Sequence, residues 1–161
     1  MCIRDSPSSG PHSNGYALIR KIFTHAAINP ETEQLTSHST VLDAVMQPTR
    51  IYVKSVLKAM ATGQVTGAVH VTGGGFRENL PRSFGDHLTA HIDLDTWTRP
   101  AIFKWLEVQG DVGAEEMLRT FNCGIGFVVF CAPQHVENVT EVLASTGEEP
   151  LVIGELTARQ T

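Results

Sequence analysis

The sequence lacks the features that mark membrane-spanning, secreted and nucleic-acid-binding proteins. Its 161 residues contain no apolar run near the roughly 18 residues that a transmembrane helix needs. The N-terminus has neither the basic region nor the apolar region of a signal peptide. Lysine and arginine form no block and the formal net charge is −5, which argues against a general binder of nucleic acid or of anionic membranes. A small phosphorylated ligand needs only local hydrogen-bond donors, so the charge balance does not exclude a protein that binds one.

Cysteine is also scarce, and its spacing carries no metal signal. The three cysteines, Cys2, Cys123 and Cys131, cannot all pair with one another and show no Cys-x-x-Cys spacing. This excludes a disulfide framework and a zinc site, and it favours a reducing cytosol. The seven histidines show no HExxH-like spacing, so we expect no dedicated transition-metal site. We interpret Cys123 as a buried structural thiol rather than a nucleophile, because no base is adjacent to it.

What the sequence does contain is a run of three glycines. Glycine is costly to order, and a chain keeps such a run where φ must be positive or where the backbone must approach something closely. A strand that passes through glycines into a helix N-terminus exposes N–H groups that can cradle a phosphate, but a tight turn without a ligand has the same pattern. The polar residues beside the run can donate to a phosphate or a ribose, or can lie on the surface. The run and these neighbours are Gly73, Gly74, Gly75, Thr72, Asn79 and Arg82.

A second polar segment precedes the first expected helix. Residues 6–15 are rich in Ser, Pro and Gly, and the apolar residues that follow recur at helical spacing from residue 16 to residue 23. Ser13 or Asn14 is the expected N-cap of this helix. His12 then lies before a helix N-terminus, where the positive end of the dipole lowers the pKa of an imidazole and favours anions. His12 is therefore a candidate general acid/base or phosphate donor, or a loop histidine that caps its own turn.

The periodicity of the remaining residues predicts the fold class. Helices are expected near residues 16–23, 39–46 and 49–60, followed by elements in the order β-α-β-αα-β-α-β. The expected strands cover residues 64–72, 88–94, 127–131 and 151–156. With 42% hydrophobic residues, the chain can form one domain with a proper core. We expect an α+β fold, a layered α/β/α domain with a mixed sheet of about four strands.

Four segments together resemble one known family. They read Ser-Ser-Gly-Pro-His-Ser-Asn-Gly-Tyr at 8–16, Pro-Thr-Arg-Ile-Tyr-Val-Lys at 48–54, His-Val-Thr-Gly-Gly-Gly-Phe-Arg-Glu-Asn-Leu-Pro-Arg at 70–82, and Phe-Asn-Cys-Gly-Ile-Gly at 121–126. In this order they are similar to the C-terminal half of phosphoribosylformylglycinamidine cyclo-ligase, the aminoimidazole ribonucleotide synthetase of purine synthesis. Residues 14–16 and 122–126 favour this family over the related selenophosphate synthetases, thiamin-phosphate kinases and large amidotransferase.

The resemblance implies an ATP-dependent ring closure on a phosphoribosyl substrate, formylglycinamidine ribonucleotide. ATP phosphorylates the formyl oxygen, an amidine nitrogen attacks the activated carbon, and phosphate leaves as the imidazole forms. Glycine N–H groups suit the phosphates, and His12 suits proton movement or the developing charge on oxygen. With the resemblance, the phosphate nest becomes the favoured interpretation of the glycine run. The implied site comprises His12 as the catalytic residue, with Ser9, Ser13, Asn14, Thr72, Gly73, Gly74, Gly75, Asn79 and Arg82 around substrate and phosphate.

The resemblance also implies parts that this sequence does not match. The family has a longer, two-domain architecture, whose N-terminal domain carries most of the groups for ATP and Mg²⁺ and makes most of a cytoplasmic homodimer. Residues 1–5 match nothing in the family and look like translated adapter sequence. We expect a non-native or disordered tail over 1–5, the C-terminal domain over 6–161, and no turnover by this chain alone. The alternative is a free-standing, non-catalytic phosphate- or nucleotide-binding module built on the same domain.

Overall fold

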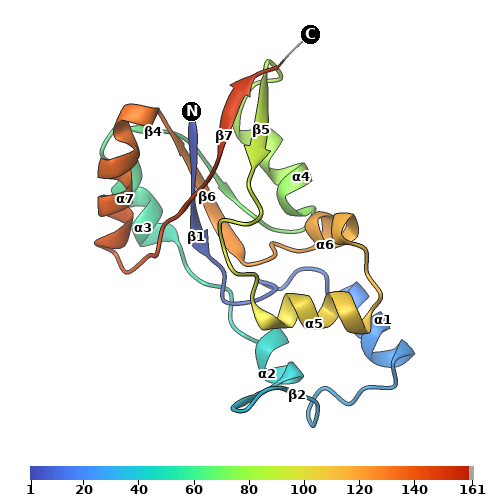
Figure 1. Ribbon diagram of the computed structural model, residues 1–161. Helices are drawn as coiled ribbons and strands as arrows, with labels where there is room; N and C mark the ends of the chain where they lie inside the picture. The colour runs from blue at the N-terminus through green and yellow to red at the C-terminus, as the bar shows by residue number, and fades with distance from the viewer. Residues whose placement is uncertain (160–161) are drawn as a thin grey trace.

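A five-stranded sheet forms the centre of the computed structural model, which describes residues 1–159 (Figure 1). The strand order is β4 (Val65–His70), β6 (Ile125–Cys131), β1 (Cys2–Pro7), β7 (Val152–Ala158) and β5 (Leu88–Ile92). Every neighbouring pair is antiparallel. The α+β class predicted from the sequence is confirmed; the sheet has five strands where about four were expected, and the expectation of a mixed sheet is wrong because every pair is antiparallel. A separate hairpin pairs β2 (Gln34–Thr36) with β3 (Ser39–Thr40).

The additional strand is β1, in the middle of the sheet. It pairs with β6 on one side and with β7 on the other, and Ile3 is fully buried. Its two charged side chains form hydrogen bonds with the backbone just before β7. Arg4 donates to the Pro150 carbonyl (3.2 Å), and Asp5 accepts from the Leu151 N–H (2.8 Å). Burial raises the pKa of Asp5 to about 6. The expectation of a disordered tail over residues 1–5 is therefore wrong from Cys2 onward, while their non-native origin stays a prediction.

Helices cover both faces of the sheet. On one face lie α3 (Val53–Met60) and α7 (Val136–Ala144), and on the other lie α4 (Gly75–Asn79) and the 3-10 turn η1 (Leu80–Ser83) (Figure 1). Strand β6 contributes to both cores because its side chains alternate: Val129 packs toward α7, and Val128 and Phe130 pack toward α4. The continuous apolar run at residues 127–131 is thus explained by burial on both sides.

A helical part lies at one end of the sheet, in the lower half of Figure 1. It consists of α1 (Tyr16–His25), α2 (Val41–Val45), α5 (Ala101–Gln109) and α6 (Ala114–Thr120). Its core is built from apolar positions at helical spacing, including Ile19, Ile22, Phe103 and Leu106. The chain then returns to the sheet through β6, η2 (Pro133–His135), α7 and β7, so the predicted order of elements after residue 64 is confirmed.

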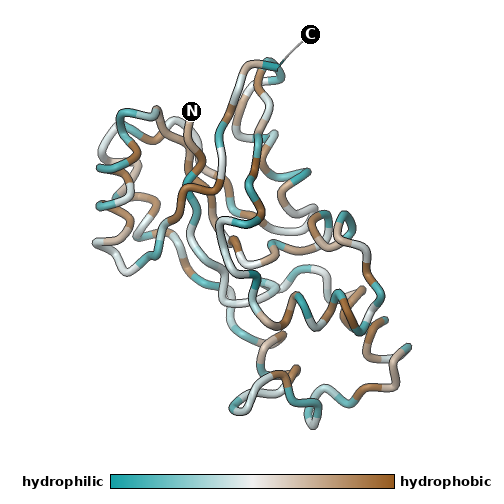
Figure 2. The backbone as a smooth tube through the Cα atoms, viewed as in Figure 1, coloured by the Kyte–Doolittle hydropathy of each residue, from teal (hydrophilic) through white to brown (hydrophobic). Residues whose placement is uncertain are grey.

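Helix α3 carries an apolar stripe on its outer side. Val53, Leu57 and Met60 are each more than half exposed, and Ile51, just before the helix, is 81% exposed. The inner side instead presents small residues such as Ala59 to α7. Figure 2 shows apolar and polar residues alternating along α3 and α7. Within residues 1–159, no helix is both long and apolar enough to span a bilayer.

The central position of β1 predicts a large effect of a single truncation in it. Ile3→Ala removes a fully buried side chain from the core between the sheet and α4, so we expect a loss of about 2–4 kcal/mol in the free energy of unfolding. Val152→Ala, on the neighbouring strand but 42% exposed, should cost less than about 1 kcal/mol. Urea unfolding of both variants checks this difference. Equal, small effects would contradict the placement of residues 2–7 in the sheet.

Candidate functional site

The four segments that carry the family resemblance meet where the sheet joins the helical part. Because β1 and β4 both run antiparallel to β6, their C-terminal ends lie beside its N-terminal end, with Pro7 opposite Ile125 and His70 opposite Phe127. The chain leaving β1 enters residues 8–16, and the chain leaving β4 enters the glycine run. Residues 48–54 close the cluster from the side of α3.

Asn122 ties two of these segments together. Its side chain is 1% exposed, and its Oδ1 accepts from the Ser8 hydroxyl (2.9 Å) and the Gly124 N–H (2.9 Å). Its Nδ2 donates to the Gly10 carbonyl (2.8 Å). Losing this carboxamide would leave several buried groups unpaired. In the sequence, Asn122 stands out only as part of the resembling segment 121–126, although an Asn among glycines before a buried strand is a usable signal for such a clamp.

Cys123 is buried in a position that disfavours the reactive thiolate. Its backbone φ is 49°, its side chain is fully buried, and burial raises the pKa of its thiol to about 11. A thiol with a raised pKa is a poor nucleophile near neutral pH. The interpretation as a structural thiol is confirmed.

His12 is an internal residue of the cluster, 4% exposed. Its Nε2 accepts from the backbone N–H of Ser9 at 3.0 Å and lies 3.5 Å from the backbone N of Arg50. The Ser9 hydroxyl also lies 3.0 Å from Nε2 and is 2.7 Å from the Pro48 carbonyl, to which it donates. A backbone N–H can only donate, so we assign the neutral ring its proton on Nδ1. Nδ1 is buried and has no hydrogen-bond partner within residues 1–159.

The surroundings of His12 keep its imidazole neutral. The ring centroid lies 5.9 Å from that of Tyr52 and 6.0 Å from that of His70. Burial, followed by the nearby charges of His70 and Arg50, lowers the pKa of His12 to about 4. A position before a helix N-terminus predicts that the helix dipole lowers the pKa of His12, but the main cause of the lowered pKa is burial. A neutral imidazole with a free Nδ1–H can donate a hydrogen bond to an oxygen without transferring a proton.

Asn79 clamps the glycine turn from inside. Its side chain is buried, and its Nδ2 donates to the carbonyls of Gly75 (2.8 Å) and Gly73 (3.1 Å). Its Oδ1 accepts from the Thr72 hydroxyl (3.3 Å) and from Arg82 Nη1 (3.4 Å). These contacts give Asn79 a structural task that the sequence analysis did not predict.

The glycines have conformational reasons of their own. Gly74 has φ 93° and Gly75 has φ 54°, in the left-handed region that favours glycine. A Cβ at Gly75 would overlap the carbonyl of Leu118, so the turn approaches the end of α6 too closely for any side chain. Gly73 has no such constraint, because a Cβ there would meet only Asn14 Oδ1 at 3.3 Å.

Two of the three N–H groups in the run are already bonded within the protein. Gly73 donates to Asn14 Oδ1 (2.9 Å), and Gly75 donates to the Thr72 carbonyl (3.0 Å). The carboxylate of Glu78 lies against Gly74. A phosphate bound at this turn would therefore have to displace Asn14 and Glu78. The phosphate nest stays a prediction.

The Asn14–Gly73 hydrogen bond joins the two groups of candidate residues. One group comprises Ser9, His12, Ser13 and Asn14, and the other comprises Thr72, Gly73, Gly74, Gly75, Asn79 and Arg82. The predicted N-cap is wrong: Gly15 caps α1 with φ 71° and without a side-chain bond, because Asn14 is turned toward Gly73. Ser13 is exposed and also has a positive φ, of 60°.

The chain also contains an apolar groove of about 570 Å³ on the other side of α4. Its walls include Phe76, Leu80, Phe84 and Leu88. It contains none of the catalytic or phosphate-binding candidates, so we do not place the site there. Within residues 1–159, no three His, Cys, Asp or Glu side chains lie together as metal ligands.

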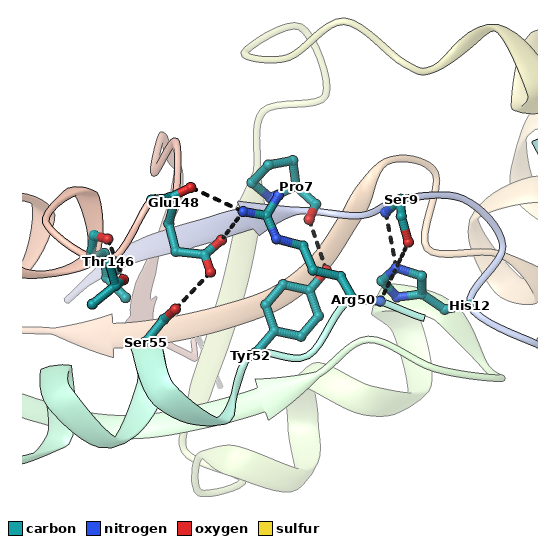
Figure 3. A network of polar contacts seen from close by, with 10 residues as sticks. Pro7, Ser9, His12, Arg50, Tyr52, Ser55, Thr146 and Glu148 are labelled. Carbon is teal, nitrogen blue, oxygen red and sulfur yellow. Dashed lines mark hydrogen bonds and ion pairs between the residues drawn. The ribbon is translucent and has the colours of Figure 1, made fainter. Parts of the chain in front are cut away.

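A further polar network borders the site and was missed by the sequence analysis (Figure 3). Arg50 forms an ion pair with the buried Glu148, and Ser55 donates to the same carboxylate. Nothing in the local sequence relates Glu148 to residues 50–55, because the two regions are brought together only by the packing of α7 on α3.

The sequence is similar to known proteins along most of its length. Residues 5–161 match the family described as AIR synthase related protein, C-terminal domain. The chain is also 48% identical over 154 residues to the phosphoribosylformylglycinamidine cyclo-ligase of Chromobacterium violaceum. This match covers 95% of the chain but 44% of that protein, so the chain spans less than half the length of this relative.

The geometry of the turn predicts that an alanine is tolerated at Gly73 but not at Gly75. Gly75→Ala meets both an unfavourable φ and the Leu118 carbonyl, so we expect a loss of about 2–4 kcal/mol in the free energy of unfolding. Gly73→Ala should cost less than about 1 kcal/mol. Thermal and urea unfolding of the two variants provide the comparison. If Gly75→Ala were as stable as Gly73→Ala, the close approach to α6 would be refuted.

The burial of His12 predicts an abnormal titration. In NMR spectra of the folded chain, its ring should titrate with a midpoint of about 4, against about 6.5 in the urea-unfolded chain. Because the folded pKa is the lower one, the stability that His12 contributes is complete above pH 6.5 and is lost as the pH falls toward 4. His12→Asn should remove that part of the pH dependence, with the opposing contribution of Asp5 unchanged. A midpoint near 6.5 in the folded chain would contradict this account.

Proposed function

The chain belongs to the family of AIR-synthase-related proteins, whose C-terminal domain it matches, and on this premise we propose that it is the C-terminal part of a phosphoribosylformylglycinamidine cyclo-ligase. The complete enzyme would convert formylglycinamidine ribonucleotide and ATP into aminoimidazole ribonucleotide, ADP and phosphate. The main support is that the four resembling segments, up to 118 residues apart, form one cluster. The family expected from those segments is confirmed by the comparisons.

We propose that His12 serves the substrate oxygen as a neutral hydrogen-bond donor. In the reaction the formyl oxygen takes up a phosphoryl group, and negative charge builds on it again when the amidine nitrogen attacks and the carbon–oxygen bond breaks. The lowered pKa of His12 makes its imidazole a poor proton carrier near neutral pH, while its Nδ1–H is a donor without a partner among the described residues. Buried donors without partners are rare in folded proteins, which supports a partner supplied on binding. Access to Nδ1 requires the covering residues to move.

The surface beside His12 is suited to the phosphorylated substrate. Ser9 and Ser13 are exposed hydroxyl residues, and Asn14 is partly exposed at the contact with Gly73. We propose that these residues position the ribotide and that the glycine turn accepts a phosphate once Asn14 moves. Arg82, which lies 4.0 Å from Glu78 and is exposed, supplies a positive charge at the same edge.

The remaining parts of the enzyme are proposed to lie outside this chain. The relative is more than twice as long, and the exposed stripe of Ile51, Val53, Leu57 and Met60 starts inside the segment 48–54. We propose that the N-terminal domain of the complete enzyme covers this stripe and faces the cluster, since large exposed apolar patches mark interaction surfaces. Most groups for ATP and Mg²⁺, the homodimer contacts and a cytoplasmic location belong to this proposal. The described residues lack a metal-ligand cluster, so we derive no step through the metal.

The alternative is a free-standing phosphate- or nucleotide-binding module without catalysis. One observation favours it: the polar groups of the glycine turn are largely satisfied within the chain, as expected of a domain that is complete by itself. Such a module would bind its ligand without a second domain.

A chimaera distinguishes the two functions. The N-terminal part of the Chromobacterium violaceum relative, fused to this chain in place of its own matching part, should form aminoimidazole ribonucleotide in the presence of ATP, whereas the chain alone should show no turnover. Product formation is measured by its arylamine colour reaction. Turnover by the isolated chain, or none by a folded chimaera, would contradict the proposal.

Within the chimaera, the role of His12 has a matched control. His12→Asn should lower kcat by about 10²–10³, as the loss of one oxyanion donor does in other enzymes. His25→Asn, at an exposed position on α1, should leave kcat unchanged. Because His12 is neutral throughout, the pH–rate profile should contain no step that disappears in His12→Asn between pH 6 and 8. Such a step in the parent chimaera would show that His12 transfers a proton.

A further inference from the structure

Glu148 is a buried acid in the connection between α7 and β7. Its side chain is 3% exposed, and its Oε1 accepts from the Ser55 hydroxyl at 2.7 Å. Its Oε2 lies 3.0 Å from Arg50 Nη2 in an ion pair whose alignment is poor for a hydrogen bond (Figure 3). A buried carboxylate is costly unless it is paired, so this residue is expected to have a specific task.

Arg50 connects this carboxylate to the candidate site. Its guanidinium forms the ion pair with Glu148 and also donates a hydrogen bond to the Gly147 carbonyl (3.1 Å). Its backbone N lies 3.5 Å from Nε2 of His12. One residue therefore joins the buried acid, 136 positions away in the sequence, to the imidazole.

The segment around Arg50 is fixed from two sides. Toward the site, the Ser9 hydroxyl donates to the Pro48 carbonyl (2.7 Å), and the Tyr52 hydroxyl donates to the Pro7 carbonyl (2.8 Å). On the opposite side, Glu148 supplies the only buried carboxylate that faces the guanidinium among the described residues. Without that anchor, the Arg50 side chain keeps only its bond to the Gly147 carbonyl, and we expect the 3.5 Å contact between the Arg50 N–H and Nε2 to lengthen.

We propose that Glu148 is a positioning residue for His12: through Arg50 it holds the second of two backbone N–H donors against Nε2, beside that of Ser9, and so strengthens the preference of the ring proton for Nδ1. The inference rests on the proposed function only in the role that the His12 Nδ1–H plays toward the substrate oxygen. Which ring nitrogen of His12 carries the proton can be measured without an activity assay.

Two-bond ¹H–¹⁵N NMR spectra of the ¹⁵N-labelled chain show which ring nitrogen carries the proton. In the parent chain, His12 should be predominantly the Nδ1–H form. Glu148→Gln should raise the Nε2–H fraction of His12 at least several-fold. Glu149→Gln, which changes the exposed neighbouring acid, should leave the spectrum of His12 unchanged.

A second variant covers the case in which Glu148→Gln does not fold. The double variant Arg50→Met/Glu148→Met replaces the ion pair with apolar side chains, a change that proteins often tolerate. It should also raise the Nε2–H fraction. A folded variant that keeps His12 in the Nδ1–H form to the same extent as the parent chain would overturn the proposal, and would do so whether or not the chimaera is active.

Discussion

The carboxamide of Asn122 is the contact on which the arrangement of the site depends. It bonds simultaneously to the chain that leaves β1, at Ser8 and Gly10, and to the bend that enters β6, at Gly124. Because it is almost fully buried, water cannot replace these bonds, and the loop of residues 8–15 has one available path. That path carries His12 into the interior and brings Asn14 to the glycine turn.

The chemistry available at the site follows from this burial. An imidazole held against N–H donors on one nitrogen and lacking solvent on the other stays neutral, so His12 is suited to donate a hydrogen bond rather than to move a proton. The glycine turn is likewise organised from within, by Asn79, and its outer surface is occupied by Asn14 and Glu78. The cluster is thus one preorganised wall, and the proposed second domain would supply the facing groups and a reason for the covering residues to move.

Local sequence patterns were sufficient for the elements whose signals are local. Helical spacing predicted α1, and a continuous apolar run predicted β6, because each pattern reports its own burial. Strand β1 was missed because six residues that include Arg4 and Asp5 show no period, and their partners lie in β6 and β7, more than 100 residues away. The same holds for the site: the segments were recognisable, but the clamp of Asn79 and the pairing of Arg50 with Glu148 exist only in the folded chain.

Native-state amide hydrogen exchange tests most directly whether the cluster is one unit. We expect the amides of Ser9, Gly73 and Gly124, which belong to three different segments, to exchange with a common free energy of opening. Asn122→Ala should lower all three together, although Asn122 bonds directly to only one of these amides. If the substitution changed Gly124 alone and left Ser9 and Gly73 protected, the segments would be held independently, and the central role of Asn122 would be contradicted.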